Sequence, residues 1–185
     1  MKLAVIFPGI GYHTDKPLLY YSKKLAKEQG FEIMSIDYSG FDPSIKGNPD
    51  KMKEAFLSAL SQAEEILKDI NFSDYEKVLF ISKSVGTAVA GAYADKHSLN
   101  TCNIFYTPVE QSFSVMNNPG IVFHGNDDPW LKHETFMSCI KKTDYPYYVI
   151  DKGNHSLETG DAVQDIKNMA YIMEKTKEYI ISQNA

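Results

Sequence analysis

The sequence predicts an α/β fold, a three-layer α/β/α sandwich around a six-stranded, mostly parallel sheet. Short apolar runs of strand length alternate with segments of helical periodicity along the chain, and this alternation favours a parallel sheet with helices on both faces. Polar residues that could carry chemistry follow directly after several of these runs. In open parallel sheets such positions share one edge, where ligands bind. The 185 residues, 43% of them hydrophobic, are expected to form one domain over residues 1–185.

Six apolar runs are the predicted strands, because they are rich in strand-forming residues and end at turn-formers. They span residues 3–7, 31–36, 77–81, 102–106, 121–124 and 147–150. The predicted helices run from Thr14 or Asp15 to Gln29, over 52–70, from a turn at Ser84 to His97, over 131–141, and from a capping Asp161 onwards. In this last helix the expected buried side carries Ala162, Ile166, Met169, Ala170, Met173 and Ile180.

The charged residues argue against a nucleic-acid partner. The formal net charge is −5, and all 19 basic side chains are lysine. Without arginine there is no bidentate fork for phosphate, carboxylate or guanine, and no basic stretch marks a nucleic-acid face. No stretch approaches the ~18 apolar residues of a membrane span, and the first apolar run is too short for a secretory leader. We expect a cytoplasmic protein with no membrane contact, and leave open whether it is a homo-oligomer.

Neither the cysteines nor the first glycine loop predicts a cofactor. Cys102 and Cys139 have no spacing typical of a metal site or a disulfide framework, so we expect buried thiols. Gly9 and Gly11 follow the first strand, but the third glycine of a dinucleotide fingerprint would fall at Thr14. Nucleotide binding is therefore a weak alternative. The other interpretation is that this loop turns a backbone N–H, that of Ile10, toward Ser84.

The stretch around Ser84 predicts a nucleophile at a sharp turn. The apolar run of the third strand breaks at SKSVG (82–86) and resumes as small residues with helical spacing, which indicates strand, turn and helix. A serine nucleophile needs such a corner, with small neighbours that let strand and helix pack closely. Gly86 meets this need, whereas Ser82 stands where glycine is usual. By itself the motif also fits a tight turn of small residues.

Two further loop residues complete a set for nucleophilic catalysis. A serine nucleophile needs a neutral imidazole to accept its proton and a carboxylate to orient that imidazole. Asp128 follows the fifth predicted strand and His155 follows the sixth. The chain order Ser84, Asp128, His155 differs from the orders of the chymotrypsin and subtilisin types. Asp127 is an alternative acid, since charge alone does not distinguish adjacent carboxylates.

With these motifs the chain resembles a small serine hydrolase of the α/β-hydrolase superfamily, of the esterase or dienelactone-hydrolase kind. The resemblance covers nearly the whole chain, through the segments FPGIG (7–11), SKSVG (82–86), HGNDDP (124–129) and GNHS (153–156). It implies Ser84 as nucleophile, Asp128 as acid and His155 as base. It also implies an oxyanion hole from the backbone N–H groups of Ile10 and Val85. The two strands that usually precede the first strand are missing, so the resemblance implies a minimal version of the fold.

The resemblance also implies an open site. A cap domain usually lies between the fourth and fifth strands counted here, where residues 107–119 leave room for about one turn of helix. We expect hydrolysis of a small-molecule ester or related acyl bond, because an aromatic, weakly charged rim suits an uncharged acyl group. The alternative is a non-catalytic relative that binds a ligand or acts as a scaffold. The residues expected at the rim are Tyr12, Tyr38, Phe41, Thr107, Val109, Phe113, Trp130 and Leu157.

Overall fold

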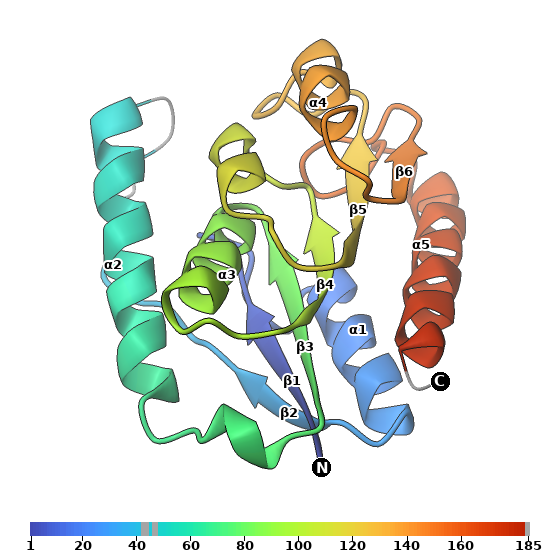
Figure 1. Ribbon diagram of the computed structural model, residues 1–185. Helices are drawn as coiled ribbons and strands as arrows, with labels where there is room; N and C mark the ends of the chain where they lie inside the picture. The colour runs from blue at the N-terminus through green and yellow to red at the C-terminus, as the bar shows by residue number, and fades with distance from the viewer. Residues whose placement is uncertain (42–44, 46–47, 184–185) are drawn as a thin grey trace.

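The computed structural model of the protein describes residues 1–41, 45 and 48–183, so the middle of the loop after the second strand lies outside the described residues. The strands are β1 (Lys2–Phe7), β2 (Glu32–Ser35), β3 (Lys77–Lys83), β4 (Cys102–Tyr106), β5 (Gly120–Gly125) and β6 (Tyr147–Ile150). Over the described residues these six strands form one sheet in the order β2-β1-β3-β4-β5-β6 (Figure 1). Every neighbouring pair is parallel. The predicted sheet is confirmed, and it is parallel throughout.

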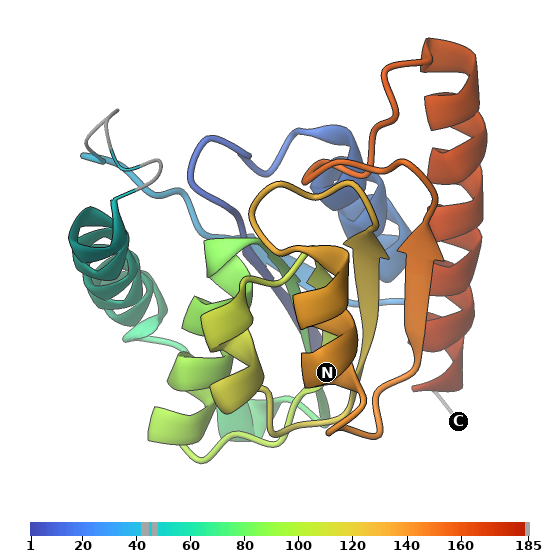
Figure 2. The same cartoon turned by 90° about the horizontal axis from the view of Figure 1, so that it is seen from above.

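Helices cover both faces of this sheet. They are α1 (Pro17–Glu28), α2 (Pro49–Leu67), α3 (Val85–Lys96), α4 (His133–Ile140) and α5 (Ala162–Ser182), with short 3-10 helices η2 (Phe72–Asp74) and η3 (Glu110–Ser114). Seen from above, α1 and α5 lie on one face of the sheet, and α3 and α4 on the other, with α2 beside α3 (Figure 2). Residues 107–119, all of them described, contain η3 alone, so no cap domain covers the sheet edge there.

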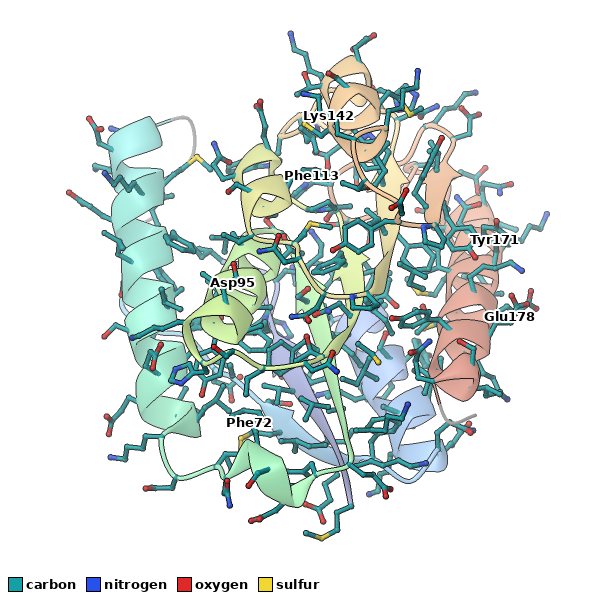
Figure 3. All side chains as sticks on the ribbon, in the orientation of Figure 1. Phe72, Asp95, Phe113, Lys142, Tyr171 and Glu178 are labelled. Carbon is teal, nitrogen blue, oxygen red and sulfur yellow. The ribbon has the colours of Figure 1, made fainter. Side chains whose placement is uncertain are left out.

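Alternate side chains of the strands pack into the hydrophobic clusters on the two faces of the sheet. In β1, Ala4 and Ile6 point to the cluster under α1 and α5, whereas Leu3, Val5 and Phe7 point to the cluster under α2 and α3. All five side chains are at most 2% exposed. A strand that is covered on both faces needs an uninterrupted apolar run, which is what its sequence provides. A third cluster lies where η3 and α4 pack on the sheet, and there Phe113 contacts Phe136 with ring centroids 6.2 Å apart (Figure 3).

A chain of buried hydroxyls joins α1, the sheet and α5. The Tyr106 hydroxyl of β4 lies 2.9 Å from Ser22 Oγ of α1 and 2.6 Å from Thr176 Oγ1 of α5. Ser22 Oγ also donates to Leu18 O within α1. Buried hydroxyls without partners are costly, so this network favours one position of α1 and α5 relative to β4.

The ends of two helices refine the sequence prediction. Helix α1 begins at Pro17 with Lys16 at its N-cap, rather than being capped by Thr14 or Asp15. Proline needs no hydrogen-bond acceptor for its nitrogen, so it suits the first position of a helix. Asp161 caps α5 as predicted, since its side chain accepts hydrogen bonds from the N–H groups of Val163 and Gln164.

The predicted buried face of α5 is wrong in its first turns. Ile166 is 70% exposed, and Ala162 and Ala170 are exposed too. The fully buried residues are Ile172, Thr176 and Ile180, farther along the helix. Figure 2 shows the cause: the first turns of α5 stand clear of the sheet, so that an apolar stripe there has nothing to pack against.

Among the described helices, none combines the length and the apolar character that spanning a bilayer requires.

Gly86 sets how closely α3 can approach β1, and it yields a stability prediction. A Cβ atom at Gly86 would lie 2.3 Å from Phe7 O and 2.4 Å from Pro8 O. Gly86→Ala should therefore push the helix from the sheet and lower the free energy of unfolding by about 2 kcal/mol, as measured by urea denaturation. Ala92→Ser, at a half-buried position of the same helix, is the control and should cost about 0.5 kcal/mol. Equal losses for the two variants would contradict the close approach.

Candidate active site

The backbone at Ser84 is strained and held from both sides. Ser84 lies between β3 and α3 with φ 56° and ψ −127°. A non-glycine residue with such angles costs on the order of 1–3 kcal/mol and persists only where its surroundings impose it. Here the Ser84 N–H donates to Tyr106 O at 3.0 Å, and Ser84 O accepts from the N–H of Thr87 at 2.9 Å. The strand ladder and the first helical turn thus fix the corner on which the Ser84 hydroxyl stands.

The serine that replaces the usual glycine before this corner is accommodated by the neighbouring strand. Ser82 is fully buried in β3. Its Oγ donates a hydrogen bond to Ile104 O of β4 at 3.2 Å. The side chain therefore points into the sheet, away from the cavity, and its one polar atom has a partner.

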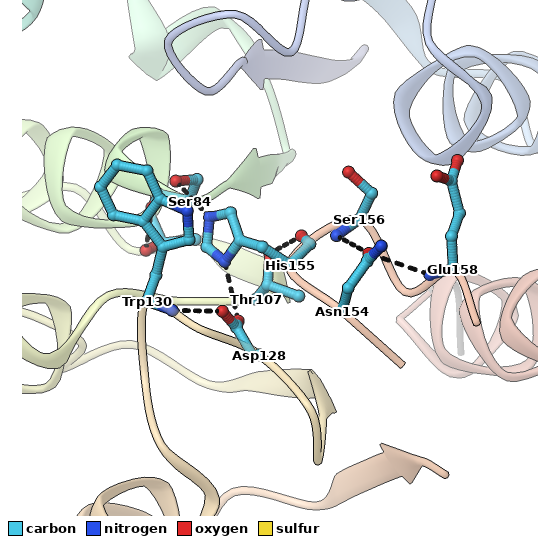
Figure 4. Close-up of polar contacts among 9 residues, drawn as sticks. Ser84, Thr107, Asp128, Trp130, Asn154, His155, Ser156 and Glu158 are labelled. Atoms are coloured by element: carbon cyan, nitrogen blue, oxygen red, sulfur yellow. Dashed lines mark hydrogen bonds and ion pairs between the residues drawn. The ribbon is translucent and has the colours of Figure 1, made fainter. Parts of the chain in front are cut away.

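Three side chains from three loops form one hydrogen-bonded chain (Figure 4). Ser84 Oγ lies 2.7 Å from His155 Nε2, and His155 Nδ1 lies 2.7 Å from Asp128 Oδ2. These loops follow β3, β5 and β6, whose carboxyl ends meet at one edge of the sheet. An arrangement of this kind can move a proton from the hydroxyl to the imidazole while the carboxylate stabilises the resulting charge.

The hydrogen bonds assign the tautomer of His155. The Asp128 side chain is fully buried; its Oδ1 accepts from the N–H of Trp130 at 2.8 Å and its Oδ2 faces His155. Burial opposes ionisation of Asp128, but the hydrogen bonds from His155 and from Trp130 outweigh it and keep the pKa of the carboxyl below its usual value. An ionised carboxylate only accepts, so Nδ1 carries the proton and Nε2 is free to accept from Ser84.

The imidazole itself is biased toward its neutral form. Burial lowers the pKa of His155, and the positive charge of Lys83 lowers it further, whereas the hydrogen bond to Asp128 raises it. The net direction is downward. Near pH 7 the ring is therefore mostly neutral, which is the form that can accept a proton.

The loop that carries His155 is fastened to the sheet edge. Thr107 Oγ1 donates to His155 O at 3.0 Å, and Asn154 Oδ1 accepts from the N–H of Ser156 at 2.7 Å (Figure 4). Gly125, at the end of β5, allows this loop to approach: a Cβ there would lie 2.1 Å from Gly153 O. These contacts hold the backbone of the loop, whereas Asp128 and Ser84 contact the ring of His155.

The two residues expected to supply the N–H groups of an oxyanion hole, Ile10 and Val85, line the same cavity as Ser84. Val85 is the first residue of α3, so its N–H has no acceptor within the helix. Ile10 lies in the loop after β1, and this loop approaches so closely that a Cβ on Gly9 would be 3.1 Å from Ser84 Cβ. Ile10, Val85 and Ser84 all line the same cavity.

That cavity has a volume of about 550 Å³ and opens beside Ser84 and His155, a size typical of small-molecule sites. It contains most of the expected rim: Tyr12, Tyr38, Phe41, Val109 and Trp130 line it. Ile45 and Met52 also line it.

Three residues expected at the rim lie elsewhere. Thr107 is fully buried, and its hydroxyl holds the His155 loop. Leu157 is 2% exposed and belongs to the core beneath α1 and α5. Phe113 packs on α4. Thr107 directly follows β4 and Leu157 follows His155 by two residues, but the side chains of both are buried.

Sequence reasoning missed two lysines of this cavity. Lys83, between Ser82 and Ser84, lines it although the residue is only 1% exposed, and Lys16 lines it beside α1. Burial lowers the pKa of Lys83 to about 7. Lys83 is the last residue of β3, beyond the apolar run, so no local pattern signalled its burial.

The other candidate groups take no part in the hydrogen-bonded chain. Asp127 is exposed, and its N–H donates to Gly153 O. His124 is fully buried and stacks on Phe136, with ring centroids 4.0 Å apart; burial lowers its pKa to about 4. Among the described residues, no group of three or more His, Cys, Asp or Glu side chains is placed to hold a metal ion.

Known structures with this architecture come from several organisms. Est1E of Butyrivibrio proteoclasticus with ferulic acid bound matches 99% of this chain and 89% of its own, at 14% identity and a TM-score of 0.71. An α/β serine hydrolase homologue from Coxiella burnetii matches 95% and 84%, at 14% identity and a TM-score of 0.67. The chain has the α/β-hydrolase fold. A serine hydrolase without lid from Xanthomonas campestris matches 98% and 82%, at 9% identity and a TM-score of 0.65.

At these identities the likeness establishes the fold alone. No protein-family model matches the sequence, and no curated protein matches it either.

The charges around His155 give a prediction for its titration. Lys83→Met should raise the pKa of His155, because it removes a positive charge that disfavours the imidazolium; Asp128→Asn should lower it, because it removes the charge that favours the imidazolium. NMR titration of the ring nitrogens measures both shifts. Lys27→Met, at an exposed position of α1, is the control and should leave the pKa unchanged. A pKa that moves in neither site variant would show that these charges do not act on His155.

Proposed function

We propose that this protein is a serine hydrolase that cleaves a carboxylic ester or a related acyl bond through an acyl-enzyme on Ser84. The observation that carries the proposal is the unbroken chain from Ser84 Oγ through His155 to Asp128, whose serine end opens into a cavity. A buried, oriented carboxylate and a neutral imidazole in contact with an exposed hydroxyl are the requirements for activating a serine.

The first half-reaction transfers the acyl group to the enzyme. Ser84 Oγ attacks the acyl carbon while its proton passes to His155 Nε2, across the 2.7 Å hydrogen bond. Asp128 stabilises the imidazolium that forms and does not itself take the proton. The bond from the acyl carbon to the leaving oxygen then breaks, and His155 gives its proton to the departing alcohol.

Charge on the substrate oxygen is stabilised by backbone donors. The N–H groups of Val85 and Ile10 would bind the oxyanion of the tetrahedral intermediate, and the N-terminus of α3 adds a favourable dipole. Each such donor is worth about 3 kcal/mol of transition-state stabilisation. Water then enters, His155 removes one of its protons, and attack on the acyl-enzyme releases the acid and restores Ser84.

Two solved structures of the same fold support an ester as the substrate class. One contains ferulic acid bound to Est1E, and another is described as an esterase of Pyrococcus furiosus, with a TM-score of 0.64. The absence of a cap over residues 107–119 leaves the cavity open to a small acyl substrate. A carboxylesterase activity is therefore the form of the reaction we propose.

Replacement of Ser84 tests the proposal. Ser84→Ala should reduce the hydrolysis of p-nitrophenyl butyrate by about 10³-fold or more and abolish labelling by a fluorophosphonate, because the nucleophile is gone. Steady-state kinetics and intact-protein mass spectrometry measure the two effects.

Ser82→Ala is the matched control, because Ser82 is the neighbouring serine, buried and bonded to Ile104 O. It should keep both activity and labelling. Retention of turnover by Ser84→Ala would refute the acyl-enzyme. If the unmodified protein reacted with no serine-directed reagent, a non-catalytic binding or scaffolding role would replace the proposal.

A further inference from the structure

A buried cation stands at the wall of the cavity without an anionic partner. Lys83 is 1% exposed and lines the cavity, and its Nζ lies 5.0 Å from the centroid of the Tyr12 ring. Among the described residues, no hydrogen bond or ion pair is made by Lys83 Nζ. A buried ammonium is costly unless a charge or hydrogen bond compensates it, and the face of one ring compensates only part of that cost.

A second cation faces the same ring. Lys16 also lines the cavity, and its Nζ lies 5.2 Å from the Tyr12 centroid. The charge of Lys16 disfavours protonation of Lys83 and adds to the effect of burial, so the two ammonium groups repel each other across the cavity wall. An anion bound at these amines would offset this repulsion.

The acidic groups nearby do not fill that role. Asp128 and Glu158 both attract the charge of Lys83. The carboxylate of Asp128 is already occupied by His155 and the N–H of Trp130, and Glu158 is exposed. Neither lines the cavity, and none of the described lining residues is acidic. Among the described residues, the lining of the cavity therefore contains two lysine side chains and no carboxylate, and a bound anion would favour the protonated form of Lys83.

We propose that the acyl substrate carries a second carboxylate, which is bound by Lys83 and Lys16 while Ser84 attacks the ester carbonyl. This inference rests on the proposed function and names its substrate class, a monoester of a dicarboxylic acid. The Tyr12 ring, which both amines face, lines the cavity and supplies apolar surface along which the methylene chain of such a substrate would lie. This charged substrate differs from the uncharged acyl group expected from the aromatic rim, because that expectation did not include the two lysines.

The test compares two esters that differ only in charge. One is mono-p-nitrophenyl adipate, and the other is the matching ester with a terminal carboxamide; the pimelate and suberate pairs are run beside them, because the distance from Ser84 to Lys83 sets the chain length. The measured quantity is the ratio of kcat/KM for the carboxylate ester to that for the amide ester at pH 7. Because both esters use the same triad, the ratio cancels any effect of a lysine on His155.

The unmodified protein should prefer the carboxylate ester of the best pair by about 30-fold, the size expected for a desolvated charge pair. Lys83→Met should bring the ratio to within about threefold of one, and Lys16→Met, at a half-buried position, should lower it less. Methionine replaces a buried charge by an apolar chain of similar length, which a fold tolerates. Lys27→Met should keep the original ratio. A ratio near one in the unmodified protein, or an unchanged ratio in Lys83→Met, would overturn the inference.

Binding to Ser84→Ala separates this inference from the proposed function. Calorimetric titration should detect adipate binding to Ser84→Ala and its loss when Lys83→Met is added. Ser84-dependent hydrolysis without any preference for the carboxylate overturns the inference alone. Adipate binding without hydrolysis of either ester overturns the proposed function alone. If neither adipate binding nor ester hydrolysis is detected, both the inference and the proposed function are overturned.

Discussion

The left-handed backbone at Ser84 is the constraint on which the rest of the site depends. A φ of 56° turns the chain from β3 into α3 within one residue, so that the hydroxyl stands at the end of the strand and the first free N–H groups of the helix lie beside it. The strain is retained because the strand ladder continues through Ser84 N and because Gly86 lets α3 press against the main chain of β1. The packing of the α/β/α layers thus holds the strained turn in place and fixes the position of Ser84 Oγ.

The second component of the site, His155, is held both at its backbone, by Thr107, and at its ring, by Asp128. The loop after β6 contains no helix or strand. Thr107 donates a hydrogen bond to it, and Gly125 lets it approach the edge of the sheet closely at Gly153. The buried carboxylate of Asp128 then selects the tautomer. Burial and Lys83 together oppose the protonation that Asp128 favours, and the balance keeps the ring neutral. Two opposing electrostatic effects are thus needed at once, one to orient the imidazole and one to leave it basic.

Much of this architecture could be predicted from the sequence, because parallel strands covered on both faces appear as continuous apolar runs and because their carboxyl ends meet at one edge. The positions of Ser84, Asp128 and His155 followed from that edge. The buried face of α5 did not, since helical periodicity shows which residues share a stripe but not how far the sheet extends beneath it, and Ile166 lies beyond its end. Thr107 and Leu157 follow strands or site residues, but which way their side chains turn depends on loop conformation. Lys83 was overlooked because burial of a lysine depends on Tyr12 and the loop after β1, which no local pattern describes.

Ser82 shows what the position before the elbow requires in physical terms. Its side chain occupies no space that the helix needs, because it lies within the sheet and its hydroxyl reaches a carbonyl of the adjacent strand. The requirement is therefore a limit on volume together with a partner for any polar atom, and not the absence of a side chain. Serine satisfies it here. A pattern written with glycine at that position passes over such chains, whereas one written for small residues at the end of a buried strand recovers them.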